Sequence, residues 1–268
     1  MAVVLAFISI KGGVGKTTLA IETASCLANY FGKRVLLVDA NFSAPNVGLY
    51  LDLTNDLTLH DVLSGEGLHT AIYESHGFDV VPASLYYGKE IDIFSLKNVL
   101  SKIKDQYDFI ILDSSPNYYE LIPVIAAANK IFIVTTPDSV TLETTLKAAK
   151  LARQKKTPIE GVIVNKIKNP NYEADLLDIE EFFKIPVLAK IRDSKKLTEA
   201  LFYKKPLTVH DKNHEISREI RKLSSALCGM PEEPESFFER LLSFRNMVER
   251  QKINREIVRQ SFYQASFN

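Results

Sequence analysis

The sequence feature that most restricts the possible folds is a glycine-rich turn that joins an apolar segment to a helix-forming one. The apolar segment is Val3–Ile10, the turn reads Lys11-Gly-Gly-Val-Gly-Lys-Thr-Thr18, and Thr17–Phe31 has apolar residues at helical spacing. A short apolar run of this kind is typical of a buried strand. Strand, glycine turn and helix, in this order, form the context in which backbone N–H groups can surround a phosphate. A Cβ at any of three glycines would intrude on that anion: Gly12, Gly13 and Gly15.

The rest of the chain repeats the alternation of strand and helix. Most strand candidates are β-branched runs without polar alternation, as in strands that are covered on both faces. We therefore expect an α/β fold with a doubly wound, mostly parallel sheet flanked by helices. The expected strands are Val3–Ile10, Arg34–Asp39, Phe78–Pro82, Phe109–Asp113, Lys130–Thr135, Ile159–Asn165 and Pro186–Ile191. The expected helices are Thr17–Phe31, Leu96–Gln106, Tyr118–Ala128, Leu142–Gln154, Asp175–Phe183, Lys195–Phe202 and Asn213–Leu227.

Chain length and a proline-bearing linker predict the domain organisation. With 268 residues, 46% of them apolar, the chain can bury one sizeable core but not two. The segment Gly229–Glu235 combines a helix stop, two prolines and several acids, which is typical of a linker. We expect a phosphate-loop domain over residues 1–230 and an amphipathic helical tail over residues 231–268. The apolar residues of that tail are Phe237, Phe238, Leu241, Leu242, Phe244, Met247, Val248, Ile253, Ile257, Val258 and Phe262.

The charge balance and the cysteines exclude several partner and cofactor classes. Lys and Arg equal Asp and Glu at 33 each, so no overall field draws the protein toward nucleic acid or anionic membrane. Cys26 and Cys228 lie far apart in the sequence, so a zinc or iron–sulfur site within one chain is excluded. We see no basic leader and no uncharged run of membrane-spanning length, and therefore expect a cytoplasmic protein.

The phosphate loop, taken with one downstream acid, predicts binding of ATP and Mg²⁺. Lys16 would reach the β- and γ-phosphates, and the Thr17 hydroxyl would be a ligand of Mg²⁺. Asp113, at the end of the buried strand Phe109–Asp113, has the position of a magnesium holder. The remaining nucleotide contacts are expected from the other loop residues: Gly12, Gly13, Val14, Gly15 and Thr18.

Lys11, at the front of the loop, restricts which group of phosphate-loop proteins the chain resembles. The run from Lys11 to Thr18 resembles the deviant Walker A motif of the ParA/MinD ATPases. In that family the first lysine reaches the γ-phosphate bound by the partner subunit, so the resemblance implies an ATP-dependent homodimer with Lys11 acting in trans. A cation that arrives only on dimerisation makes the dimer and the transition state depend on one contact.

The resemblance extends from Val3 to about Leu227 and implies further site residues. Residues 38–49 look like switch I, residues 112–116 like Walker B with switch II, and residues 134–139 like the turn after the next strand. Asn165 and Lys166 resemble the segment that reads adenine, and Arg192 and Asp193 the loop that packs on the base. Residues 43–49 and 202–207 most resemble the MinD-like branch.

Asn41 departs from the family pattern. The family has two acids in switch I, the second of which orients the attacking water, whereas this chain has Asp39 and Asn41. Asp39 can still serve Mg²⁺, but an amide cannot accept a proton from water, although it can hold water by hydrogen bonds. One interpretation is a slow ATPase; a second is a nucleotide-bound scaffold without hydrolysis; a third is an asparagine introduced to trap the dimer. Because phosphoryl transfer depends mainly on positioning, we expect weak ATPase activity.

The tail leaves the partner open. Phe237–Phe244 resembles the membrane-targeting helix of MinD proteins, but its charges cancel and about two dozen residues follow it. Docking on the core or on a partner helix is the first interpretation, peripheral membrane contact the second, and DNA the third. Two functions follow: a cycling ATPase that positions or partitions a cellular cargo, and an ATP-bound dimeric scaffold that recruits a protein. The residues that could form a basic DNA-binding patch are Lys195, Lys196, Lys204, Lys205, Lys212, Arg218, Arg221 and Lys222.

Overall fold

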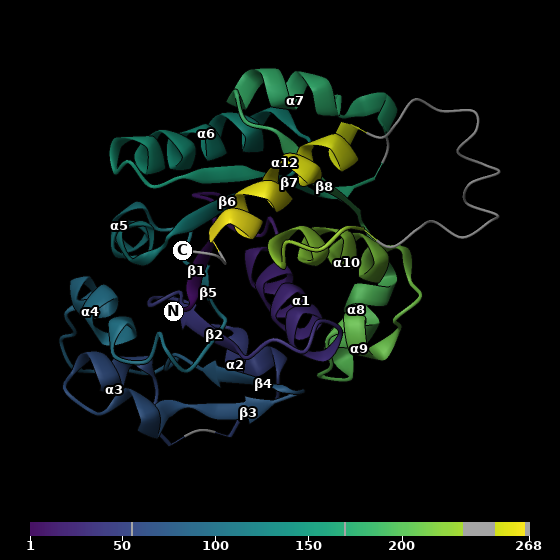
Figure 1. Cartoon of the computed structure of the whole chain (residues 1–268). Coiled ribbons are helices and arrows are strands. Elements are labelled where there is room, and N and C mark those ends of the chain that lie inside the picture. Colours follow the sequence, from purple (N-terminus) through teal and green to yellow (C-terminus); the bar gives the residue numbers. More distant parts are fainter. Residues whose placement is uncertain (55, 169, 233–249, 266–268) are drawn as a thin grey trace.

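A computed structural model describes residues 1–54, 56–168, 170–232 and 250–265 and contains one eight-stranded sheet (Figure 1). Neighbouring strands are parallel except β3 and β4, so the predicted doubly wound, mostly parallel sheet is confirmed. In spatial order the strands are β3 (Tyr73–Ser75), β4 (Phe78–Val81), β2 (Val35–Ala40), β5 (Phe109–Ser114), β1 (Val3–Ile8), β6 (Lys130–Thr135), β7 (Ile159–Ile167) and β8 (Val187–Arg192).

Helices cover both faces of the sheet and enclose two apolar clusters. One face carries α3 (Leu59–Leu63), α4 (Leu96–Ser101), α5 (Tyr118–Ala127), α6 (Ser139–Gln154) and α7 (Leu176–Phe183). The other face carries α1 (Lys16–Asn29), α2 (Val47–Tyr50), α8 (Lys195–Phe202), α9 (Leu207–His210), α10 (Glu215–Leu227) and α12 (Arg250–Ala265). Three 3₁₀ turns complete the described elements: η1 (Leu68–Ala71), η2 (Ile93–Ser95) and η3 (Pro170–Tyr172).

The elements that the sequence did not predict are the short ones. Strand β3 and helices α2, α3 and α9 have five residues or fewer, too few to show a helical or strand period. Helix α6 begins at Ser139, three residues before the expected start, because the Asp138 carboxylate accepts a hydrogen bond from the Thr141 N–H at 2.9 Å. Cys26 is buried and Cys228 is half-buried, and both are free thiols.

The described part of the tail lies on the sheet. Helix α12 packs against α10 and β8, burying Val258 and Phe262 (Figure 1). This agrees with docking on the core, the first of the three interpretations of the tail. Residues Phe237–Phe244, which carry the resemblance to a membrane-targeting helix, lie outside the described residues. Among the helices that the structure does describe, none is both long enough and apolar enough to cross a bilayer.

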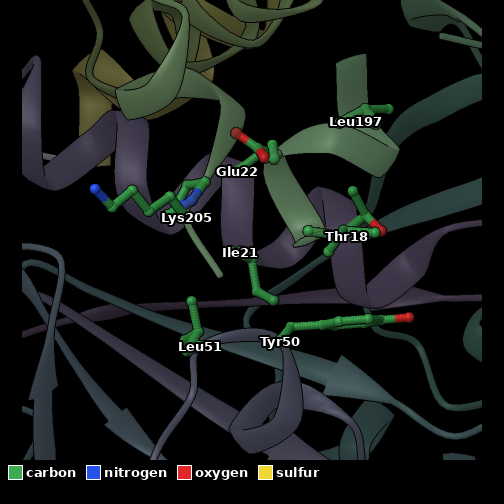
Figure 2. A pocket seen from close by; sticks show the side chains of 10 residues that line it. Thr18, Ile21, Glu22, Tyr50, Leu51, Leu197 and Lys205 are labelled. Carbon is green, nitrogen blue, oxygen red and sulfur yellow. The ribbon is translucent and has the colours of Figure 1, made fainter. Parts of the chain in front are cut away.

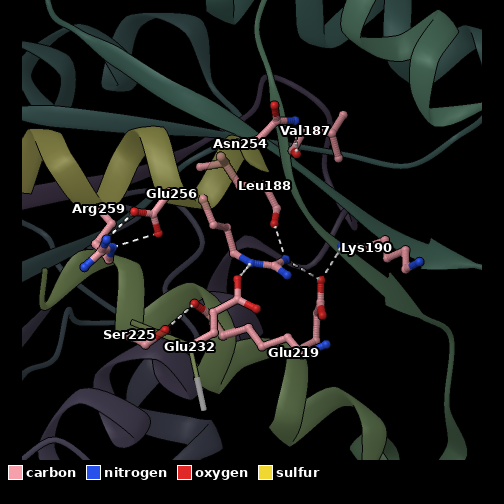
Figure 3. A network of polar contacts seen from close by, with 11 residues as sticks. Val187, Leu188, Lys190, Glu219, Ser225, Glu232, Asn254, Glu256 and Arg259 are labelled. Carbon is pink, nitrogen blue, oxygen red and sulfur yellow. Dashed lines mark hydrogen bonds and ion pairs between the residues drawn. The ribbon is translucent and has the colours of Figure 1, made fainter. Parts of the chain in front are cut away.

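Polar side chains join α12 to the outer edge of β8 (Figure 3). The Asn254 amide donates to the Val187 carbonyl at 2.9 Å and to Glu180 at 2.5 Å, while the Val187 N–H donates to the same Glu180 carboxylate at 2.8 Å. On α10, Glu219 accepts from the Lys190 N–H at 3.1 Å. Side chains therefore occupy backbone groups of β8 that would otherwise be available to pair with another strand.

Arg255 is the centre of this network. Its side chain is 1% exposed, and its guanidinium contacts Glu219 at 3.2 Å, Glu232 at 2.5 Å and the Leu188 carbonyl at 2.7 Å. A cation this deeply buried is stable only while its partners remain in place.

We predict that Arg255→Ala destabilises the fold by about 3–5 kcal/mol, because Glu219 and Glu232 would lose the cation that balances them. Urea denaturation followed by circular dichroism measures the change. Arg259→Ala is the matched control, since Arg259 lies on the same helix and, among the described residues, forms an ion pair with Glu256 alone. Equal midpoints for the two variants would show that the buried pairs do not hold α12.

Candidate functional site

The glycine-rich loop joins β1 to α1 at the carboxyl edge of the sheet. Gly13 and Gly15 have φ angles of 78° and 96°, which residues other than glycine rarely adopt. A Cβ on Gly15 would lie 2.2 Å from the Asn165 amide nitrogen. Asn165 is buried and donates to the Val14 carbonyl at 2.8 Å, so the end of β7 holds the loop in its turn.

The two lysines of the loop have different surroundings. Lys16 is 6% exposed and its ammonium donates to the Lys11 carbonyl at 3.3 Å, across the loop. Burial lowers the pKa of Lys16, and the charge of Asp113 opposes that shift. Lys11 is exposed at the front of the loop. The arrangement places one cation inside the loop and leaves the other free to reach outward.

Two buried acids and a hydroxyl meet beneath the loop. Asp39 and Asp113 are paired across the parallel strands β2 and β5, and both are 0% exposed. The Thr17 hydroxyl donates to one Asp113 oxygen at 2.6 Å. The other Asp113 oxygen is buried and has no hydrogen-bond partner among the described residues. A buried carboxylate oxygen in that condition is expected to have a ligand.

The electrostatics of the acid pair point to a cation. Burial raises the pKa of Asp39, and the neighbouring charge of Asp113 raises it further. Burial also raises the pKa of Asp113, against the hydrogen bond from Thr17 and the charge of Lys16. Within the described residues no cluster of three or more His, Cys, Asp or Glu could hold a metal by itself. The set fits Mg²⁺, which takes one or two carboxylates and completes its shell with phosphate and water.

Asp39 also shapes switch I. One of its oxygens accepts from the N–H groups of Asn46 and Val47 at 3.1 and 3.0 Å, and the other from that of Asn41 at 3.2 Å. The predicted magnesium acid therefore fixes both ends of the loop that contains Asn41.

Asn41 lies inside that loop. It is 6% exposed, and its amide nitrogen donates to the Ala44 carbonyl at 2.5 Å. Its side-chain oxygen is buried without a hydrogen-bond partner among the described residues. The residue at the predicted water-orienting position thus has an acceptor available.

Two residues that the sequence reasoning missed hold switch I from outside. Glu120, 9% exposed near the start of α5, accepts from the Ser43 N–H at 3.2 Å. The His60 ring, 4% exposed on α3, contacts the Phe42 carbonyl at 3.1 Å and accepts from the Ser84 N–H at 3.1 Å. Burial lowers the pKa of His60, which favours the neutral ring that this pair of contacts requires. Neither residue belongs to a sequence motif, so only the three-dimensional structure identifies them.

The residues expected at the base lie at the ends of β7 and β8. The Asp193 N–H donates to the Ile167 carbonyl at 2.9 Å, which joins the two strand ends. Arg192 pairs with Glu215 at 3.9 Å, Asp193 with Lys168 at 3.6 Å, and Lys166 is exposed with a φ of 57°. The structure brings Lys166, Arg192 and Asp193 to one rim, while the Asn165 amide contacts the loop. Adenine contact by these four residues stays a prediction.

Comparison with known proteins gives consistent matches. Residues 5–207 match the family model of the CobQ/CobB/MinD/ParA nucleotide-binding domain. An uncharacterised ATP-binding protein of Methanocaldococcus jannaschii is 31% identical over 82% of this chain and 86% of its own length. The septum site-determining protein MinD of Bacillus subtilis is 28% identical over 87% of this chain and 94% of its own. A MinC:MinD cell division complex from Aquifex aeolicus superimposes with a TM-score of 0.78 at 26% identity, over 87% of this chain and 98% of that one.

The acid pair makes the nucleotide-free protein sensitive to pH. Carboxyl groups with raised pKa values bind protons in the folded state that the unfolded chain releases, so wild-type stability should fall as the pH rises above about 4. Asp113→Asn removes the repulsion within the pair, and we expect a smaller fall in melting temperature between pH 5 and pH 8.

Thermal melts without nucleotide or Mg²⁺ measure this difference. The control is Asp108→Asn, which removes a partly exposed acid just before β5. If wild type and Asp113→Asn lose stability in parallel as the pH rises, the two acids do not repel each other in the fold.

Proposed function

The chain belongs to the CobQ/CobB/MinD/ParA nucleotide-binding family, and we propose that it is an ATP-dependent dimerising switch that positions or partitions a cellular cargo, with weak ATPase activity. The observation that carries the proposal is the Thr17–Asp113–Asp39 group beneath the loop that contains Lys16. A glycine turn alone could serve any anion, but these groups together suit a nucleotide phosphate with its metal.

ATP and Mg²⁺ are the cofactors of this site. The N–H groups of the loop bind the phosphates, and the Lys16 ammonium balances their charge from inside the turn. The Thr17 hydroxyl and the Asp113 and Asp39 carboxylates would hold Mg²⁺, which supplies positive charge for the phosphoryl oxygens when bound. The two acids are already deprived of solvent, so they need little rearrangement to receive a cation.

Dimerisation through the loop face is supported by the exposure of Lys11. Its ammonium has no hydrogen bond or ion pair within the described residues, although its carbonyl and N–H are both held in the loop. The backbone is therefore fixed while the charge is free, as a lysine that reaches a second subunit requires. A structural relative from Aquifex aeolicus is a MinC:MinD complex, which supports a switch that engages a second protein.

Slow hydrolysis is supported by the surroundings of Asn41. Its amide accepts no proton, but its buried oxygen, which has no partner in the described part of the chain, can hold a water in place. The contacts from Asp39, Glu120 and His60 keep the loop in position. Positioning without a base gives a protein that remains ATP-bound for long periods, which also agrees with the scaffold alternative.

We predict that Lys11→Ala and Lys16→Ala separate dimerisation from binding. Lys16→Ala should weaken ATP binding by at least about tenfold, because it removes the buried cation of the loop. Lys11→Ala should bind ATP within about threefold of wild type yet remain a monomer. Titration calorimetry and light scattering with ATP and with ADP measure the two properties. An ATP-dependent dimer of Lys11→Ala would contradict its role in trans.

Asn41 is expected to limit the rate of hydrolysis. Asn41→Asp supplies a carboxylate at the water-orienting position, and single-turnover hydrolysis should accelerate at least about tenfold. Asn46→Asp is the matched control, because Asn46 lies in the same loop and its amide also donates to Ala44. A wild-type rate equal to that of Asn41→Asp would rule out the slow switch. No turnover in either protein, with the dimer intact, would favour the scaffold.

A further inference from the structure

Tyr50 is the last residue of α2, the short helix that directly follows switch I. Its side chain lines a small cavity with Thr18 and Ile21 of α1 and with Leu51 (Figure 2). Figure 2 shows the ring extending beneath Thr18, with its hydroxyl oxygen at the end of the side chain on the Thr18 side of the cavity. The ring belongs to the helix that follows switch I, and Thr18 is the last residue of the phosphate loop.

The ring and the hydroxyl of Tyr50 have different explanations. Packing against the apolar cluster accounts for an aromatic ring, and a phenylalanine would provide the same contact. The hydroxyl has no hydrogen-bond partner within the part of the chain that the structure describes. The oxygen is not enclosed by the protein, so a ligand bound in the site can reach it and replace water as its partner.

The position and the protonation state of the hydroxyl indicate the class of ligand that it suits. Burial raises the pKa of Tyr50, and the charge of Asp113 raises it further, so the phenol stays protonated and can donate near neutral pH. Thr18, which lines the same cavity as Tyr50, is the last residue of the loop whose N–H groups surround the phosphates. A donor in that position suits an anion, and the anion expected there is a phosphate of the nucleotide.

Helix α2 is held at both ends, which fixes the direction of Tyr50. At its start, Asp39 accepts from the Asn46 and Val47 N–H groups. At its end, the Lys204 ammonium donates to the Leu49 carbonyl at 2.8 Å, and the His76 ring contacts the Lys204 carbonyl at 2.9 Å. A four-residue helix is not stable alone, so these contacts determine where the phenol points.

We propose that the Tyr50 hydroxyl donates a hydrogen bond to a phosphate oxygen of the bound nucleotide and so acts as a positioning residue of the site. The proposal rests on the ATP-binding function given above. Asp39 accepts from the N–H of Asn41 and from that of Val47, where the helix that ends at Tyr50 begins. A phosphate held by Tyr50 therefore also restrains the segment that contains Asn41.

The test is the binding of Mg²⁺–ATP and Mg²⁺–ADP to Tyr50→Phe, measured by titration calorimetry. Loss of one charge-assisted hydrogen bond should weaken affinity about tenfold, with the melting temperature of the nucleotide-free protein unchanged. Equal losses for both nucleotides would place the contact on a phosphate that they share, and a loss for ATP alone would place it on the γ-phosphate. Affinities equal to those of wild type would overturn the proposal.

Tyr107→Phe is the matched control. The Tyr107 hydroxyl donates to Asp79 at 2.7 Å, before the start of β5 and away from its carboxyl end, so its loss should lower the melting temperature and leave nucleotide affinity unchanged. Lys16→Ala distinguishes a failure of the Tyr50 proposal from a failure of the nucleotide-binding function. If wild type binds Mg²⁺–ATP and Lys16→Ala does not, a normal Tyr50→Phe rejects only the role of Tyr50; if wild type does not bind, the nucleotide-binding function itself is rejected.

Discussion

The parallel register of β2, β5 and β1 is the constraint on which the site depends. It sets Asp39 beside Asp113 on β2 and β5, and Asp113 beside Phe7 just before the loop leaves β1. All three strands end at the same edge, so a loop, a hydroxyl and two acids meet there without long side chains. Both acids are fully buried, and the repulsion between them is relieved only by protons or by a cation. The fold thus holds two mutually repelling acids at the place where Mg²⁺ and phosphate would bind.

Asp39 connects this pair to switch I. The same carboxylate that faces Asp113 accepts three backbone N–H groups from residues 41, 46 and 47. Any change in its charge, by protonation or by a cation, alters the strength of those hydrogen bonds. Asn41 and Tyr50 both depend on them for their positions. Nucleotide occupancy and the conformation of residues 41–47 would therefore both depend on Asp39, which gives a physical basis for the proposed switch even though Asn41 carries no carboxylate.

The sequence predicted the order of the elements and the chemistry of the loop because both have local signals. Apolar runs mark the strands, and the turn from Lys11 to Thr18 needs glycines that few other structures require. Glu120, His60 and Tyr50 could not be predicted, because their contacts with switch I or the loop arise from tertiary packing. Asn165 was identified from the resemblance, but its contact within the protein could not be predicted. The resemblance implied contact with adenine, whereas the structure also gives its amide a structural contact with Val14 that no motif encodes.

The polar contacts of α12 oppose release of this helix from the core. A terminal helix that binds only through apolar residues could leave the core and find a membrane or a partner at little cost. Helix α12 instead places Asn254 and Arg255 on buried acids of α7 and α10, and its release would leave Glu180 and Glu219 without those donors and expose the edge of β8. Glu232 and Arg250, on either side of residues 233–249, are themselves ion-paired, to Arg255 and to Glu180. A partner that bound that segment and released α12 would have to replace these ion pairs and hydrogen bonds.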